Sequence, residues 1–143
     1  MTDQKIAEKV FHLMYDNDPF SKWLGIELVA IERGYCHLKM TVRKEMLNGF
    51  DIMHGGISYS LADSAFAFAS NSYGKKAVST SVIMQYPKAT KEGEVITAIA
   101  KTISLSPKTA ILDVEVKNQK GELVGLFRGT AYRTDKNWIE ESE

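Results

Sequence analysis

A lone carboxylate within an apolar segment is the first feature of this sequence that could do chemistry. Asp63 is the only Asp, Glu, Lys or Arg in residues 54–72. An ionised carboxylate away from water is unfavourable unless it is paired or hydrogen-bonded. Two interpretations follow: a structural acid satisfied by Tyr59, Ser60, Ser70 or a basic group from elsewhere, or a functional carboxylate whose pKa burial raises.

The start of the same segment carries a second signal. His54-Gly55-Gly56 opens a predicted helix, and the first N–H groups of a helix have no partner within it. These groups lie at the positive end of the helix dipole, and glycine lets another group approach them closely. The arrangement could polarise a carbonyl or hold an oxyanion. The simpler alternative is a tight connection between loop and helix in which packing requires small residues.

The spacing of the two features constrains how they could act together. Gly55 and Asp63 lie eight residues apart, a rise of about 12 Å on one helix. A catalytic acid must lie within hydrogen-bond reach of the reacting atoms. Two antiparallel copies of the helix could bring Gly55 of one chain to Asp63 of another. If both residues serve one site, the protein is at least a dimer.

The helix that carries these residues needs a surrounding sheet. Residues 54–72 are apolar or small around the whole circumference, which predicts a buried helix. Strands are expected at residues 26–31, 35–42, 78–86, 94–103, 110–116 and 123–133, with the last four joined by short turns as an antiparallel meander. A short amphipathic helix is expected at 4–15 and ends at 16–19. This order predicts an α+β fold with an antiparallel sheet.

Length and composition predict one domain over residues 1–143, with an N-terminal helical segment at 1–20 and a polar tail at 134–143. The 18 basic and 18 acidic residues balance, which argues against a nucleic-acid partner. No apolar run approaches the roughly 20 residues of a membrane span, so no membrane is expected as a partner. The single cysteine and the absence of a signal-peptide pattern favour a cytoplasmic location.

Three motifs together resemble a known family. Asn48-Gly49, His54-Gly55-Gly56 and Leu61-Ala62-Asp63 are similar to those of the hotdog-fold acyl-CoA thioesterases, in particular the phenylacetic acid degradation type. The resemblance covers about residues 25–133. It implies a hotdog fold, in which a curved antiparallel sheet of about six strands wraps a long central helix. It also implies an acyl-CoA substrate and dimers with joined sheets and shared sites, usually assembled into homotetramers.

The resemblance assigns a role to each matching residue. Asp63 would be the catalytic carboxylate, either as general base or as nucleophile, and the Gly55 N–H would polarise the thioester carbonyl. Asn48 and His54 would orient water or the thioester in the same pocket. The candidate substrate-binding residues are Gly56, Ser79 and Phe66. No metal is implied, and no cofactor other than the coenzyme A of the substrate.

Simpler and competing interpretations accompany these roles. Asn48 precedes a glycine, so a plain turn explains it, and Phe66 would equally serve as helix packing. A hotdog dehydratase would pair a catalytic histidine with an acid, whereas a non-enzymatic module would bind acyl-CoA without turnover. The glycine pair after His54 favours hydrolysis, and a carboxylate on a buried helix favours an enzyme. An aromatic or medium-chain acyl group is expected, the aromatic one from the resemblance alone.

Overall fold

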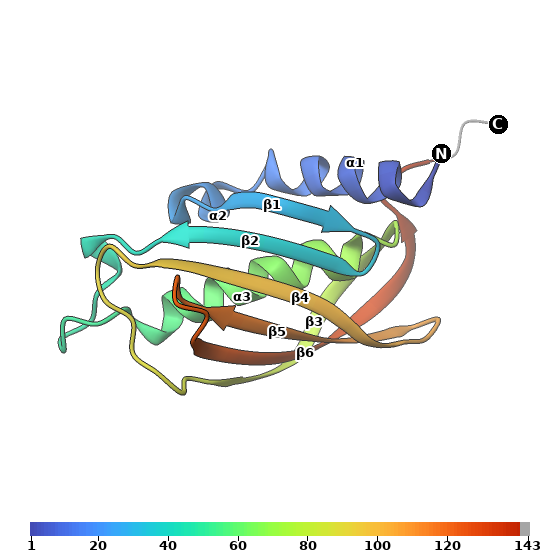
Figure 1. Ribbon diagram of the computed structural model, residues 1–143. Coiled ribbons are helices and arrows are strands. Elements are labelled where there is room, and N and C mark those ends of the chain that lie inside the picture. The colour runs from blue at the N-terminus through green and yellow to red at the C-terminus, as the bar shows by residue number, and fades with distance from the viewer. Residues whose placement is uncertain (141–143) are drawn as a thin grey trace.

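A curved antiparallel sheet wraps around one long helix in the computed structural model, which describes residues 1–140 (Figure 1). The strands are β1 (Glu27–Glu32), β2 (Tyr35–Thr41), β3 (Lys75–Gln85), β4 (Val95–Leu105), β5 (Thr109–Lys117) and β6 (Leu123–Asn137). The helices are α1 (Asp3–Tyr15), α2 (Pro19–Leu24), the short 3₁₀ helix η1 (Lys44–Met46) and the long α3 (Gly55–Asn71). The predicted α+β architecture, with six strands around a central helix, is confirmed.

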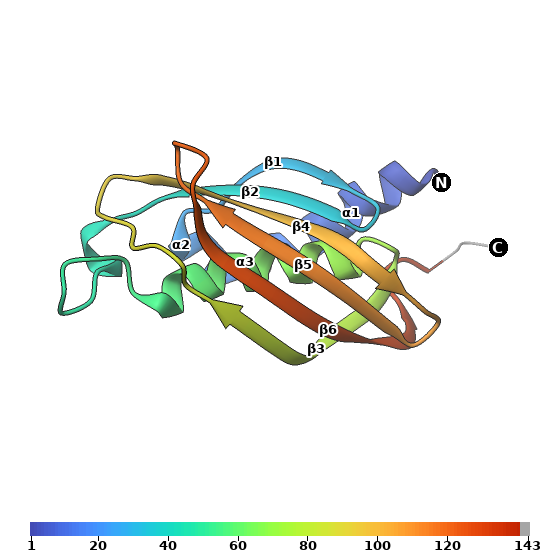
Figure 2. The same cartoon turned by 60° about the horizontal axis from the view of Figure 1, so that its bottom comes forward.

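The order of the strands corrects one expectation. The sheet runs β1-β2-β4-β5-β6-β3 and every neighbouring pair is antiparallel. The predicted meander of the last four strands is therefore wrong, because β3 pairs with β6 and only β4, β5 and β6 follow one another. Residues 86–94 between β3 and β4 are too long for a hairpin turn. They lead the chain past the start of α3, which leaves β3 at the edge opposite β1 (Figure 2).

Alternation along the strands explains why the helix fits inside the curve. Cys36, Leu38 and Met40 of β2 are fully buried, while the residues between them point to the outer face. Ala98 and Ala100 of β4 are also fully buried. Small side chains at these positions allow α3 to lie close to the sheet.

Both ends of α3 are defined by specific hydrogen bonds. At its start, the His54 side chain accepts a hydrogen bond from the Gly56 N–H. At its end, the Ser72 hydroxyl donates to the Ala69 carbonyl and accepts from the Gly34 N–H. Gly74 then turns the chain into β3 with a φ of +101°, a conformation that glycine adopts without strain.

The N-terminal segment contains a second helix that was not expected. Helix α1 matches the prediction, but residues 16–19 not only end this helix; they also begin α2. The Asp18 carboxylate accepts from the Ser21 N–H, Pro19 is the first residue of α2, and Gly25 ends that helix in the left-handed region. An N-cap, a first-turn proline and a terminal glycine are ordinary helix signals. Among residues 1–140, no helix is long and apolar enough to cross a membrane.

Candidate active site

The residue that caps α3 has a defined protonation pattern. The Gly56 N–H donates to Nδ1 of His54 at 2.8 Å. Nδ1 is therefore the unprotonated nitrogen, and Nε2 of the neutral ring carries the hydrogen. Since the His54 side chain is exposed, it presents a hydrogen-bond donor to its surroundings and not a base.

Gly55 begins the helix and offers an unused backbone donor. Its N–H has no acceptor within the described part of the chain. A Cβ atom at this position would lie 3.3 Å from the ring of Tyr86, so the glycine allows this aromatic side chain to lie beside the helix start. The N–H is available to a carbonyl oxygen at the positive end of the helix dipole.

Asn48 both forms a turn and presents a donor. Its side-chain oxygen accepts hydrogen bonds from the backbone N–H groups of Phe50 at 2.9 Å and Ile52 at 3.4 Å. The backbone N–H of Asn48 donates to the Ile52 carbonyl. The turn interpretation is thus confirmed. The amide nitrogen of the same side chain makes no hydrogen bond to residues 1–140, so it remains available to a ligand.

A cavity of about 300 Å³ lies beside the start of α3. Its walls include Asn48, Gly55, Ser58, Tyr86 and Thr90. The cavity therefore joins two of the predicted site residues from different segments. A larger hollow of about 580 Å³ lies between α1 and β1, but none of the predicted site residues lines it.

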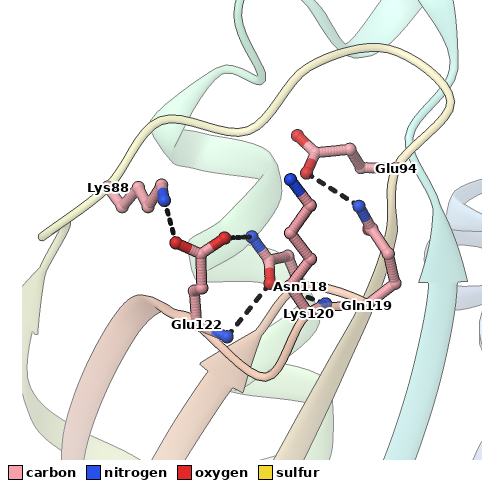
Figure 3. Close-up of polar contacts among 6 residues, drawn as sticks. All are labelled: Lys88, Glu94, Asn118, Gln119, Lys120 and Glu122. Carbon is pink, nitrogen blue, oxygen red and sulfur yellow. Dashed lines mark hydrogen bonds and ion pairs between the residues drawn. The ribbon is translucent and has the colours of Figure 1, made fainter.

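Polar contacts hold one rim of the smaller cavity in place. Lys88, which lines the cavity, forms an ion pair with Glu122 in the turn between β5 and β6 (Figure 3). Asn118 donates to the same carboxylate at 3.1 Å, and the hydrogen bond from Lys88 lowers the pKa of Glu122. Gln119 donates to Glu94 at 3.2 Å in the same network. Residues 86–94 are thereby tied to the β5–β6 turn.

Asp63 lies in the middle of α3 without a partner. The structure shows no hydrogen bond or ion pair to its carboxylate from any described residue. Ser60 donates instead to the Gly56 carbonyl at 2.6 Å and Ser70 to the Ala67 carbonyl at 3.2 Å. Burial raises the pKa of Asp63 because desolvation disfavours the charged form. Ser60 and Ser70, two of the partners that the structural-acid interpretation required, are thus bonded elsewhere. Neither Tyr59 nor any described basic group makes a hydrogen bond or ion pair with the carboxylate.

The remaining predicted site residues lie outside the cavity beside Gly55. Asp63 does not line it, and its place on the same helix preserves the separation of about 12 Å from Gly55. Gly56 already gives its N–H to His54. Ser79 is exposed on β3, opposite Ala131. Phe66 is buried in the core, with its ring 5.4 Å from that of Phe127.

Sequence reasoning missed several residues of the cavity, among them the polar residues Ser58, Tyr86 and Thr90. Ser58 had a usable signal, because it lies three residues after Gly55 and hence on the same side of the helix. Tyr86 and Thr90 belong to the connection between β3 and β4, whose path depends on the strand order. No local pattern in the sequence gives that path.

Comparison with known proteins places the chain in a family. The thioesterase superfamily matches residues 50–125. The acyl-coenzyme A thioesterase PaaI of Escherichia coli is 39% identical over 122 residues, which cover 85% of this chain and 87% of that protein.

Solved structures agree with this assignment. The structure of E. coli PaaI, from the phenylacetic acid degradation operon, matches with a TM-score of 0.93 at 36% identity and covers 95% of this chain and 99% of that one. A Streptococcus mutans protein bound to acetyl-CoA matches with a TM-score of 0.76 at 27% identity, covering 78% and 90%. The chain therefore belongs to the thioesterase superfamily and is a thioesterase with the hotdog fold.

Proposed function

We propose that this protein hydrolyses acyl-CoA thioesters with a carbonyl site at Gly55 and a carboxylate at Asp63. One observation carries the proposal: a single buried helix holds both a free N–H at its start and an unpaired carboxylate with a raised pKa. The E. coli relative is named as an acyl-coenzyme A thioesterase and the S. mutans neighbour holds acetyl-CoA. Both names support the acyl-CoA substrate.

The proposed chemistry divides between charge stabilisation and activation of water. The Gly55 N–H donates to the thioester oxygen, which becomes more negative as the carbonyl carbon is attacked. The Asn48 amide and the Nε2–H of His54 are further donors near the helix start. Asp63 removes a proton from water or attacks the carbon itself. In the first case water adds to the acyl carbon and the C–S bond breaks. In the second case the C–S bond breaks as Asp63 forms a mixed anhydride with the acyl group, and water then hydrolyses the anhydride to restore the carboxylate. The thiolate takes up a proton in both cases. The scheme uses no metal or bound cofactor.

A homodimer would supply the two halves of each site. Strand β3 pairs only with β6, so its other edge is free in the sheet. Two apolar residues of β3, Val78 and Ile83, are 57% and 66% exposed. An edge strand of this kind is suited to pairing with another chain. A twofold axis through paired β3 strands would place the α3 helices antiparallel, with Gly55 of each near Asp63 of the partner subunit. We propose this dimer as the active unit, assembled in pairs as a homotetramer.

The acyl group would occupy the cavity beside Gly55. Met53 and Val124 give it apolar walls, and the Tyr86 ring adds an aromatic one. An aromatic or medium-chain acyl group suits these walls. The E. coli neighbour comes from a phenylacetic acid degradation operon, which favours an aromatic acyl group such as phenylacetyl.

The geometry of His54 argues against a dehydratase. That reaction needs a histidine that removes a proton, whereas Nδ1 of His54 is occupied by the Gly56 N–H and Nε2 carries a hydrogen. A binding module without catalysis leaves the unpaired Asp63 unexplained. Hydrolysis uses both groups as the structure presents them.

Release of free thiol from a panel of aromatic and straight-chain acyl-CoAs tests the proposal. The wild type should release thiol, and Asp63→Asn should reduce kcat/KM by about 10²–10⁴-fold, the usual contribution of a catalytic acid or base. Asp113→Asn is the matched control, because Asp113 pairs with Arg128 and does not line the cavity. No release by a folded, dimeric wild type would contradict hydrolysis, and near-normal release by Asp63→Asn would exclude Asp63.

A further inference from the structure

Two buried hydroxyl groups have no hydrogen-bond partner within residues 1–140. They are Ser58 Oγ on α3 and Thr90 Oγ1 in the connection after β3, in residues that are 0% and 2% exposed. Two buried ring and guanidinium nitrogens, His37 Nε2 and Arg133 Nε, also lack a partner in the described chain, but neither residue lines the cavity beside Gly55. The other fully buried polar residues make hydrogen bonds: Ser21, Ser70, Asn71, Ser72 and Asn118. A buried hydroxyl without a partner is unfavourable. Ser58 and Thr90 are the pair of these residues that line one cavity, which points to a partner that binds there.

Both residues line the cavity that contains Gly55. Ser58 forms one wall, and the sheet leaves room for it, because a Cβ at Gly125 would lie 3.0 Å from Ser58 Oγ. Thr90 forms another wall. Its carbonyl accepts a hydrogen bond from the Met53 N–H at 2.7 Å, which fixes the residue against the loop that precedes α3. The two hydroxyls are thus held on separate, well-anchored elements.

The position of Ser58 relative to Gly55 determines how far from the thioester carbonyl a polar atom of the acyl group would have to lie to reach the Ser58 hydroxyl. It lies three residues beyond Gly55, a rise of about 4.5 Å along the helix. When the thioester carbonyl is at the Gly55 N–H, an oxygen on the third carbon of the acyl chain lies about one helical turn away. A hydroxyl there can accept a hydrogen bond from one of the two side chains and donate to the other.

We propose that Ser58 and Thr90 form a polar subsite that, among straight-chain acyl groups, selects those with a 3-hydroxyl. The proposal rests on the proposed hydrolysis of acyl-CoA with the carbonyl at Gly55. Met53 and Val124 line the rest of the cavity and accommodate the carbon chain. A straight-chain substrate without the hydroxyl leaves both side chains unpaired, and a site of this kind discriminates strongly against such an analogue.

The test compares thiol release from butanoyl-CoA and from each enantiomer of 3-hydroxybutanoyl-CoA. The wild type should favour one enantiomer over butanoyl-CoA by about tenfold or more in kcat/KM, as expected for one or two buried hydrogen bonds. Ser58→Ala and Thr90→Val should each move this ratio towards one. Ser70→Ala removes a buried hydroxyl of α3 that is bonded to the Ala67 carbonyl, and it should keep the wild-type ratio.

The outcomes separate this proposal from the proposed function. Hydrolysis of all three substrates at similar rates, or a preference that both Ser58→Ala and Thr90→Val retain, would overturn the subsite and leave hydrolysis intact. Absence of thiol release from every acyl-CoA would overturn the proposed function and the subsite with it. The two substitutions lie on different elements, so either variant, verified as folded by circular dichroism, keeps the test decisive.

Discussion

The two halves of α3 differ in how fully their polar groups are hydrogen-bonded. In residues 55–63, the Gly55 N–H, the Ser58 hydroxyl and the Asp63 carboxylate have no partner in the described chain. In residues 64–71, Ser64 bonds to Ser21 of α2 at 3.0 Å, and the Asn71 side chain makes four hydrogen bonds. The same helix therefore combines a half with unsatisfied groups and a half with satisfied ones.

The Asn71 side chain shows what the satisfied half contributes. It donates to the carbonyls of Ala67 and Ala77 and accepts from the Ala77 N–H and the Trp138 indole. These bonds join the end of α3 to the start of β3 and to the segment after β6. Satisfied buried groups stabilise the fold, whereas unsatisfied ones lower stability and remain free for a ligand. The satisfied half of α3 therefore anchors the fold, and the other half carries the groups that the proposed function uses.

Removing the free N–H at the start of α3 should lower activity far more than any substitution in the satisfied half of the helix. Gly55→Pro replaces the donor at the first helical position, where proline is tolerated. The preceding residue, His54, already has φ −59° and ψ 136°, which suits a residue before proline. We expect kcat to fall by about 10²–10³-fold, as for loss of one oxyanion donor. Gly55→Ala keeps the N–H and should lose much less, which stopped-flow thiol assays would show.

Removing the Asn71 side chain should damage stability and spare chemistry. Asn71→Leu leaves the Ala77 N–H and the Trp138 indole without their acceptor, and each unsatisfied buried group costs about 1–3 kcal/mol. We expect the free energy of unfolding in urea to fall by about 2–4 kcal/mol. Folded enzyme should retain its kcat. An unchanged unfolding midpoint would contradict the structural role of this half.

Asp63→Asn should do the reverse and stabilise the fold at neutral pH. Because burial raises the pKa of Asp63, the folded state binds the proton more tightly than the unfolded state. The contribution of Asp63 to stability is therefore largest in acid and is lost as the pH rises through the folded pKa. At pH 7 the free energy of unfolding of the variant should exceed that of the wild type. This gain should be smaller than the decrease expected for Asn71→Leu, and it should shrink near pH 4. Urea unfolding at both pH values measures this, and equal stability at pH 7 would contradict it.

The smallest predicted effect is a shift in the pH dependence of wild-type activity. A protonated Asp63 can neither accept a proton from water nor attack the carbonyl carbon. Since its pKa is raised, the acidic fall in kcat/KM should be centred above the value of about 3.9 that is usual for aspartate. Initial rates between pH 4 and pH 8 in buffers of constant ionic strength test this. A fall centred at or below the usual value would contradict a desolvated catalytic Asp63.

Local patterns predicted the elements of the molecule that have a strong period or a clear cap. The alternation in residues 35–42 gave the buried face of β2, and the apolar stretch after His54 gave α3 nearly to the residue. α2 was within reach as well, because Asp18, Pro19 and Gly25 carry ordinary helix signals. Such features depend on neighbours in sequence, so one chain is enough to predict them.

Features that depend on distant segments were not predictable in the same way. The pairing of β3 with β6 follows from the path of residues 86–94, which no local pattern specifies. The same path brings Tyr86 and Thr90 to the cavity beside Gly55. Asp63 stood out as a lone charge, but only the folded chain shows that the Ser60 and Ser70 hydroxyls bond elsewhere.

Activity of mixed dimers tests the central claim most directly, because the account requires one site built from two chains. Chains carrying Asp63→Ala and chains carrying Gly55→Pro, each with its own affinity tag, would be co-purified as heterodimers and assayed for thiol release. Each variant alone should be nearly inactive. The heterodimer should recover about half of the wild-type activity per dimer, since one of its two sites combines an intact Gly55 with an intact Asp63. Folded, verified heterodimers that stay as inactive as their parents would contradict a site shared between chains.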